Sequence, residues 1–316
     1  MLDYYIVDAF THNPFGGNPA GVVILDEQPF PNEQIMQLIA AELRYSETAF
    51  IRTLGPTKYH ARYFTPQGEV DLCGHATIAA FALLYSLGKA SGQCDLHTLA
   101  GELAIVVDHQ VLMQMAAPSI VHTLSHQESK AVYQSVGLDD YGSLPAMIVS
   151  TGLPDIMLPI NQVEELNQLK PNMEAVAMLT QRLRAVSIHA FALSNDGHIA
   201  HVRDFAPAYG IPEESATGTA NAALTHYLAT QHLITIPSEC TFLQGETMGR
   251  PSVITTRIST DGTIYVGGEA YIVGEGKLRI LNTRTLYRLK DFKHIGHSLI
   301  NCIIEKMLVG IILFNV

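Results

Sequence analysis

The 316-residue sequence has no tryptophan, only four cysteines, and few charged residues, which make up 16% of the chain. This low charge, with a hydrophobic content of 47%, excludes an intrinsically disordered protein, because disordered chains have the opposite composition. The chain carries 19 basic and 30 acidic residues and has no lysine- and arginine-rich stripe, so we expect no nucleic-acid partner. Its length corresponds to about two domains of ordinary size.

The cysteines, at positions 73, 94, 240 and 302, form neither a CxxC pair nor a zinc-ligand spacing. We therefore expect no bound metal, and a reducing, cytoplasmic location. The N-terminal segment MLDYYIVDAF lacks the basic region and the small-residue cleavage site of a signal peptide. We interpret this segment as a first strand.

The tail, residues 282–316, ends in an apolar run that begins at Leu299 and is interrupted by Glu305 and Lys306. A charged pair in the middle of a membrane span costs several kcal/mol, so we do not expect the tail to contact a membrane. We expect either an additional helix that docks on the body of the protein or a segment that arose by a shift of the reading frame.

The body of the chain contains an internal duplication. Residues 47–66 align without a gap with residues 188–207, at an offset of 141. Six positions are identical in this alignment, namely Ala49 and Ala190, Phe50 and Phe191, His60 and His201, Arg62 and Arg203, Phe64 and Phe205, and Pro66 and Pro207. After three inserted residues, Gly74 aligns with Gly218 at an offset of 144. We place the first repeat domain at residues 1–117 and the second at 118–281.

Each repeat reads as two strands, a Phe-x-Pro corner, and a helix that begins at a glycine. The two predicted helices, residues 74–89 and 218–232, are rich in alanine and have few charges on any face. Such a helix is typical of one enclosed on all sides. The sequence therefore predicts an α+β fold of two pseudo-symmetric domains, each a curled mixed β-sheet or barrel wrapped around a central helix.

The duplication would place two helix N-termini across one site. Each N-terminus offers free backbone N–H groups and a partial positive charge, which suit a carboxylate or a developing enolate. The residues there are Cys73-Gly74-His75 in the first repeat and Thr217-Gly218-Thr219 in the second. The alternative is that both are ordinary tight corners between a strand and a helix.

Glu47 marks a difference between the repeats, because the gapless alignment pairs it with Ile188. A carboxylate where the other repeat has an apolar residue is not required by the fold. Partial burial would bring its pKa towards neutrality, where the group can both take and give a proton. A capped or salt-bridged surface glutamate is the alternative.

Seven segments together resemble the phenazine-biosynthesis isomerase (PhzF-like) family, which has the diaminopimelate-epimerase-like fold. They are GGNPAGV at 16–22, YSETAF at 45–50, FTP at 64–66, EVDLCGHATIA at 69–79, FAP at 205–207, ATGTANAAL at 216–224 and QGETMGRPS at 244–252. The resemblance covers residues 1–281 and leaves out the tail. One departure is Glu214-Ser215, where the family usually has Asp-Pro.

The resemblance implies a homodimer with no cofactor, which moves a proton on a small anionic substrate by acid/base catalysis. Glu47 would carry the proton, and His75 and Glu214 would orient the substrate and tune protonation. Backbone and hydroxyl donors for the substrate would come from Gly74, Gly218 and Thr219. Asn18 would shape the wall of the site.

Two other functions stay open at this point. Racemases and epimerases of this fold use two thiols, and Cys73 aligns with Thr217 rather than with a second cysteine. A Cys/Thr pair resembles the hydroxyproline dehydratases of the same superfamily, so an amino-acid racemase or lyase that uses both residues is one alternative. A protein that binds a small anion without converting it is the other.

Overall fold

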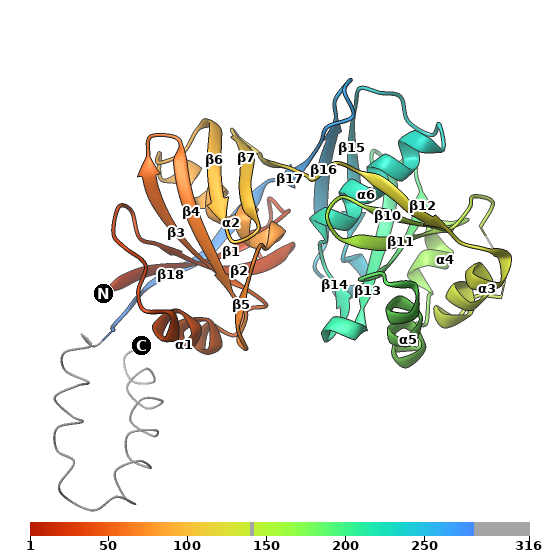
Figure 1. Ribbon diagram of the computed structural model, residues 1–316, viewed down its shortest axis with the longest axis horizontal. Coiled ribbons are helices and arrows are strands. Elements are labelled where there is room, and N and C mark those ends of the chain that lie inside the picture. The colour runs from red at the N-terminus through yellow and green to blue at the C-terminus, as the bar shows by residue number, and fades with distance from the viewer. Residues whose placement is uncertain (140–141, 281–316) are drawn as a thin grey trace, which may run out of the picture.

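The computed structural model describes residues 1–139 and 142–280, and its chain forms two lobes side by side (Figure 1). The first lobe contains β1 (Leu2–Ala9), β2 (Asn18–Ile24), α1 (Glu33–Leu43), β3 (Thr48–Gly55), β4 (Lys58–Phe64), β5 (Glu69–Val70), α2 (Gly74–Ser86), β6 (Gly92–Thr98), β7 (Gly101–Val107) and β8 (Val111–Gln114). The predicted tail, residues 282–316, lies outside the described residues.

The second lobe repeats this order with two further helices. It contains β9 (Ser119–Thr123), α3 (His126–Ser135), β10 (Met147–Ser150), β11 (Pro154–Ile160), α4 (Val163–Asn167), α5 (Met173–Leu183), β12 (Ile188–Leu193), β13 (Ala200–Ala206), η1 (Pro207–Tyr209), β14 (Ile211–Glu214), α6 (Gly218–Thr230), β15 (Ser238–Gln244), η2 (Glu246–Met248), β16 (Ser252–Ile258) and β17 (Ile264–Gly268). A last strand, β18 (Ala270–Leu278), follows it.

Strand pairing follows the same scheme in both lobes. The parallel pairs β2–β3 and β4–β6 of the first lobe correspond to β11–β12 and β13–β15 of the second. The antiparallel pairs β3–β4 and β6–β7 correspond to β12–β13 and β15–β16. The mixed sheets confirm the predicted α+β class with two pseudo-symmetric halves.

A helix with no exposed stripe lies inside each curled sheet, as predicted. In α2 the buried residues run almost without interruption from His75 to Leu84, and in α6 from Gly218 to Leu228 apart from Thr219 and His226. Alanine is abundant in both helices because small side chains let the strands approach from several sides at close-packed density. These two helices begin where the lobes face each other.

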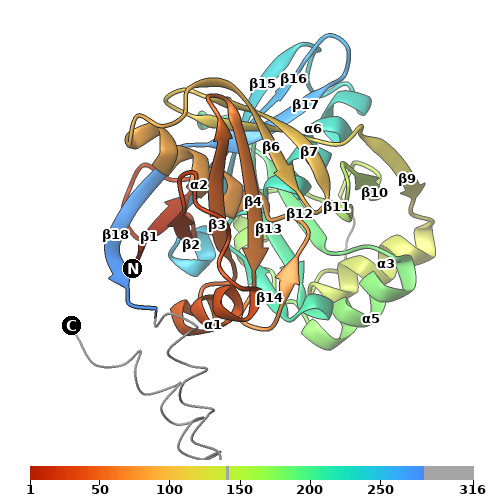
Figure 2. The ribbon, with the colours of Figure 1, turned by 60° about the vertical axis from the view of Figure 1, so that its left-hand side comes forward.

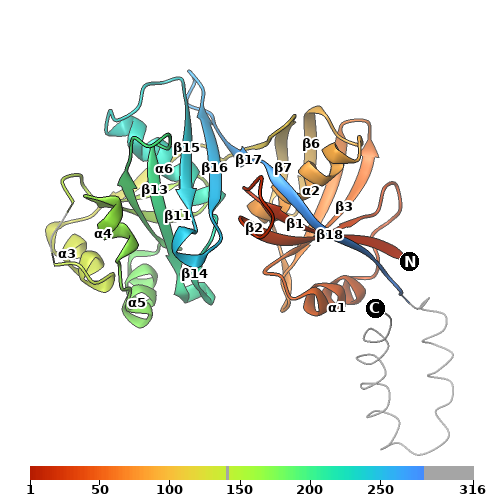
Figure 3. The ribbon, with the colours of Figure 1, turned by 180° about the vertical axis from the view of Figure 1, so that it is seen from behind.

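The last strand departs from the predicted domain limits. β18 falls within the range 118–281 that we assigned to the second repeat, but it pairs with β1 along its whole length, from Leu2–Leu278 to Ala9–Ala270. Figure 3 shows the chain crossing from β17 to β18 and so entering the first lobe. β9 pairs with β10 in the same way in the second lobe, so each lobe covers the edge of its first strand with a strand that follows the other lobe in the chain.

The outer faces of the sheets carry amphipathic helices. α1 begins after Asn32, whose side chain accepts a hydrogen bond from the Gln34 N–H, and it covers Phe50 and Phe64 on the outer face of the first sheet. α3, α4 and α5 pack on the second sheet, and Figure 2 shows α3 and α5 on its outer side. Among the helices of the described residues, none has the length and apolarity needed to cross a membrane.

Candidate active site

Glu47 lies in the loop just before β3, and its side chain points to the N-terminal turn of α2. Its backbone carbonyl accepts a hydrogen bond from the Gly21 N–H, which fixes this loop to β2. Glu47 Oε2 lies 3.3 Å from His75 Nε2, and the Glu47 and His75 side chains are 18% and 4% exposed. Ser46 Oγ is also 3.3 Å from His75 Nε2. Glu47 is therefore held against a buried imidazole rather than pointing into bulk solvent.

Burial controls the protonation of the groups beside Glu47. Desolvation lowers the pKa of His75, and the charge of Glu47 offsets part of this effect. Cys73 Sγ lies 3.4 Å from His75 Nδ1, and burial, reinforced by Glu47, raises the pKa of the Cys73 thiol well above its ordinary value. At neutral pH we therefore expect a neutral imidazole and a protonated thiol beside the Glu47 carboxyl group.

The same three side chains include a set of atoms that suits a metal ion. One ligand atom each from Glu47, Cys73 and His75 lies within 4.8 Å of the other two. These residue types are zinc ligands in proteins, and a fourth position would be open to a water or substrate. The contacts of His75 with Glu47 and with Cys73 also give these polar groups hydrogen-bond partners when no metal is bound.

Glu214 comes from the second lobe and meets the first lobe through Asn18. Asn18 Nδ2 donates to Glu214 Oε1 at 3.0 Å, and Thr217 Oγ1 lies 3.2 Å from Glu214 Oε2. Burial raises the pKa of Glu214 to about 8, with further contributions from the charges of Asp204 and Glu47. A pKa raised in this way favours the neutral form of Glu214 at pH 7, and its sensitivity to Glu47 places the two carboxyl groups in one electrostatic site.

The glycine-rich loop before β2 joins the lobes around Glu214. Ser215 Oγ donates to the Gly17 carbonyl at 3.0 Å, so the serine that replaces the expected proline forms a bond across the lobes. Gly17 has a φ of 63°, and a Cβ there would come within 2.1 Å of the Ala9 carbonyl, so only glycine fits. Arg250 donates to the same Gly17 carbonyl at 2.9 Å and pairs with Asp8 at 2.8 Å. Arg250 thus anchors the loop.

The two glycine-started helices present donors, as expected. Among the described residues, the N–H groups of Gly74, Gly218 and Thr219 have no hydrogen-bond acceptor, and neither has the Thr219 hydroxyl. The Thr217 N–H differs, because it donates to Gln244 Oε1 at 3.1 Å. A Cβ at Gly74 would meet only Met113 Cε, at 3.8 Å, so space remains beside this N-terminus.

Strand register corrects the alignment of Glu47 with Ile188. The Gly21 N–H donates to the Glu47 carbonyl, and at the same place in the second lobe the Ile156 N–H donates to the Ser187 carbonyl. Thr48 pairs with Phe64 as Ile188 pairs with Phe205, so the counterpart of Glu47 is Ser187. The gapless alignment is wrong by one residue in this strand because it matched Phe50 with Phe191. Phe50 packs on the outer face of its sheet, and Phe191 packs towards α6.

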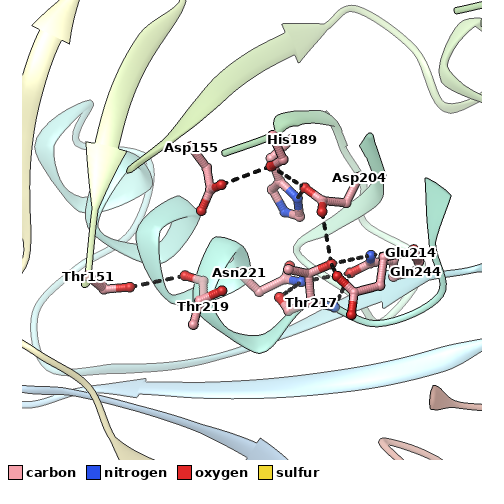
Figure 4. Close-up of polar contacts among 10 residues, drawn as sticks. Thr151, Asp155, His189, Asp204, Glu214, Thr217, Thr219, Asn221 and Gln244 are labelled. Atoms are coloured by element: carbon pink, nitrogen blue, oxygen red, sulfur yellow. Dashed lines mark hydrogen bonds and ion pairs between the residues drawn. The ribbon is translucent and has the colours of Figure 1, made fainter. Parts of the chain in front are cut away.

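A buried polar cluster behind Glu214 was missed by the sequence analysis (Figure 4). It contains Asp155, Ser187, His189 and Asp204, of which the most exposed residue, Asp155, has an exposed fraction of only 2%. The available signal was weak: an aspartate in the otherwise apolar strand PDIMLPI, and a second aspartate in AHVRDFA, which also contains a histidine and an arginine. Thr217 connects this cluster to Glu214.

Comparison with known families identifies one model, described as phenazine biosynthesis-like protein (PhzC-PhzF), that matches residues 7–276. An uncharacterized isomerase of Deinococcus radiodurans is 36% identical, and the match covers 87% of this chain and 94% of that protein. The uncharacterized isomerase YddE of Escherichia coli is 31% identical, with 85% and 95% covered.

Solved structures give a consistent result. The phenazine biosynthesis protein of the PhzF family from Bacillus anthracis has a TM-score of 0.80 and 29% identity, and the match covers 88% of this chain and 99% of that one. A hydroxyproline epimerase from Agrobacterium vitis has a TM-score of 0.60 at 11% identity, covering 88% and 90%. This second likeness shows that the fold is shared with an epimerase of low sequence identity.

Proposed function

Because the chain belongs to the PhzC-PhzF family of phenazine biosynthesis-like isomerases, we propose that it is a cofactor-independent isomerase acting on a small substrate with a carboxylate. In this proposal a proton leaves a carbon next to an unsaturated or carbonyl group and returns at another position of the same molecule. The atoms balance without an oxidant, a reductant or a second substrate.

Glu47 is the proposed proton carrier, and one observation supports this role above all others. Its carboxyl group lies 3.3 Å from the buried His75 imidazole and is only 18% exposed. A carboxylate in this position is shielded from bulk water and can both take and return a proton. His75, which burial keeps neutral, would hold the carboxylate in place from Nε2.

The substrate carboxylate would bind at the helix N-termini. The N–H groups of Gly74, Gly218 and Thr219 point out of the first turns of α2 and α6, where the helix dipoles favour an anion. Glu214, in its neutral form, would accept a negatively charged substrate nearby without repelling it. Asn18 would keep Glu214 in position from the opposite lobe.

The protonation of Cys73 argues against the thiol-based alternative. Burial and the neighbouring Glu47 carboxylate raise the pKa of the Cys73 thiol, so little thiolate is present at neutral pH to act as a base. Thr217, its counterpart, is already bonded to Asp204 and Gln244. A racemase or lyase that uses these two residues would need both groups to be free and reactive.

Deuterium wash-in tests the proposal. Wild-type protein, freed of metal with a chelator, is incubated in D₂O with a panel of small unsaturated carboxylates, and proton NMR follows both exchange at carbon and the appearance of an isomer. We expect exchange and isomerisation of the same compound. Binding of a compound without exchange would favour the small-anion binder, and release of water or ammonia would favour a lyase.

The homodimer implied by the family resemblance stays a prediction. Analytical ultracentrifugation at micromolar concentration would give the mass of one chain if it is wrong.

A further inference from the structure

A continuous line of side-chain contacts runs from the interior of the second lobe to Glu214 (Figure 4). Ser187 Oγ lies 2.9 Å from one carboxyl oxygen of Asp155 and 2.7 Å from Oδ1 of Asp204. Thr217 Oγ1 lies 3.1 Å from the other Asp204 oxygen and 3.2 Å from Glu214 Oε2. We call this line the carboxyl relay; its members are Asp155, Ser187, Asp204, Thr217 and Glu214.

The fold does not require carboxyl groups at these positions. By strand register, the first-lobe counterpart of Asp155 is Ala20 and that of Asp204 is Tyr63. Asp155 and Asp204 are 2% and 1% exposed, and burying charged groups is costly unless they are paired or hydrogen-bonded. A function that needs the carboxyl groups is the simplest reason for their presence.

The hydrogen bonds of the Thr217 hydroxyl limit the charge states of the neighbouring carboxyl groups, those of Asp204 and Glu214. A hydroxyl has one proton to donate and two lone pairs that accept. Gln244 Nε2 donates to Thr217 Oγ1 at 3.1 Å, so one lone pair and one proton remain for the contacts with Asp204 and Glu214. The hydroxyl proton makes one well-directed bond, so the arrangement that fills both contacts has one of these two carboxyl groups donating to Thr217, which means that it carries a proton.

Asp204 is the better location for the negative charge. Three groups that can donate a hydrogen bond face the Asp204 carboxyl oxygens. They are the hydroxyls of Ser187 and Thr217 and, at 2.9 Å, His189 Nδ1. The same accounting at Ser187 then puts a proton on Asp155, whose Oδ2 has no partner among the described residues. The arrangement that satisfies all contacts has neutral Asp155 and Glu214 on either side of an anionic Asp204.

We propose that Asp204 is a positioning residue that keeps Glu214 in its neutral acid form across the Thr217 hydroxyl. Asp155 and Ser187 hold a second proton behind Asp204. The effect on catalysis rests on the proposed function, because a neutral Glu214 matters only if an anionic substrate binds next to it. The charge state of the carboxyl relay does not depend on that function.

The electrostatics of the site agree with this arrangement. After burial, the charge of Asp204 is the largest influence that raises the pKa of Glu214, ahead of Glu47. Burial, followed by the charge of Asp204, also raises the pKa of Asp155 well above its ordinary value. The charge of an ionised Glu214 raises the pKa of Asp155 and, across the interface between the lobes, that of Cys73.

The relay is tested directly by titrating Glu214. Protein labelled with ¹³C at glutamate carboxyl carbons is followed by NMR from pH 5 to pH 9, and the Glu214 signal is the one missing from Glu214→Gln. We expect wild-type Glu214 to titrate near pH 8. In Asp204→Asn the loss of the charge should lower this midpoint by more than one pH unit, on the scale expected for a buried neighbouring charge.

Two further variants make the result decisive. Ser187→Ala removes a donor to Asp204 and so favours its protonation; the Glu214 midpoint should fall in the same direction by a smaller amount, even if Asp204→Asn does not fold. Glu213→Gln is the matched control, because Glu213 is the neighbour of Glu214 in β14 and pairs with Arg203 instead. A Glu214 group that is ionised at pH 7 in wild type, or an unchanged midpoint in both Asp204→Asn and Ser187→Ala, would overturn the proposal.

The catalytic consequence has its own readout. If the proposed isomerase activity is present, a one-unit fall of the Glu214 midpoint in Asp204→Asn should slow deuterium wash-in about threefold at pH 7.5, and the rate should recover as the pH is lowered to 6. A loss that is the same at every pH would show a merely structural role and would contradict the proposal. Absence of wash-in in wild-type protein would refute the proposed function, while the Glu214 titration would still decide the relay.

Discussion

The two lobes share a strand order and a buried central helix, yet equivalent positions carry different chemistry. At the helix N-terminus, Cys73 and His75 of the first lobe correspond to Thr217 and Thr219 of the second. Before the third strand of each lobe, Glu47 corresponds to Ser187. The first lobe thus contributes a half-buried carboxyl group beside an imidazole, and the second a half-buried carboxyl group connected to the buried acids Asp204 and Asp155.

Residues that are alike in the two lobes support the fold, and residues that differ between the lobes form the candidate site. Equivalent arginines have the same role in both lobes. Arg62 pairs with Glu69, and Arg203 pairs with Glu213, and each arginine lies in the strand that leads to the Phe-x-Pro corner. The conserved geometry of the duplication therefore supports the corners, whereas the asymmetric residues face the interface between the lobes. We expect variants of the first kind to change stability and variants of the second kind to change activity and its pH dependence.

The largest effect on stability should come from the central helices, where the lobes are most alike. Leu84 in α2 and Leu228 in α6 are equivalent and at most 1% exposed. Leu84→Ala and Leu228→Ala should each lower the free energy of unfolding by about 2–5 kcal/mol, because each leaves a cavity in a packed core. Urea denaturation measures this.

The control for the leucine pair is Tyr85→Ala on the same helix, at a position that is 44% exposed. It should cost less than about 1 kcal/mol. If only one of Leu84→Ala and Leu228→Ala lowered the free energy of unfolding by this amount, the two helices would not be equivalent in the folded core.

An intermediate effect is expected at Glu214, the acid of the second lobe. Its pKa is raised from 4.5 to about 8, so the stability associated with its neutral form is fully present below pH 4.5 and is lost as the pH rises through 8. Glu214→Gln cannot ionise. Thermal melts should show the variant gaining stability relative to wild type between pH 4.5 and 8.

Activity should follow the same pattern. If Glu214 works in its neutral form, Glu214→Gln should retain deuterium wash-in at pH 7 within about tenfold and should lack the wild-type decrease above pH 8. A variant that is inactive at every pH would show that Glu214 has to ionise during the reaction.

The smallest effect is expected at Cys73. Because its thiol is held protonated, Cys73→Ala should change the wash-in rate by less than about tenfold, below the range typical of acid/base residues. Loss of all activity in this variant would instead favour the racemase or lyase alternative.

Much of the fold could be predicted because the duplication is visible in the sequence. The alanine-rich helices and the Phe-x-Pro corners follow from local pattern, and both are present. The position of β18 could not be read from the repeat, because the pairing of β18 with β1 joins segments from opposite ends of the described chain. The short, polar helix α3 was missed although Ser125 and Glu128 form a capping box at its N-terminus.

On the side where family motifs are strong, the residues named from the sequence lie together, and their roles stay a prediction. Glu47, His75 and Cys73 were all named from the sequence, and they lie in contact. Asp155 and Asp204 were not, because they lie on separate strands and approach each other only through Ser187. The assignment of Ile188 as the counterpart of Glu47 failed because a shift of one residue in a strand exchanges its two faces.

Deuterium wash-in by Glu47→Gln, compared with wild type and with Glu213→Gln, tests the central claim most directly. Glutamine keeps the size and polarity of Glu47 but cannot carry the proton. We expect exchange to slow by about 10²–10⁴-fold at every pH in Glu47→Gln and to stay within a few-fold of wild type in Glu213→Gln. Exchange at the wild-type rate in Glu47→Gln would show that another group moves the proton.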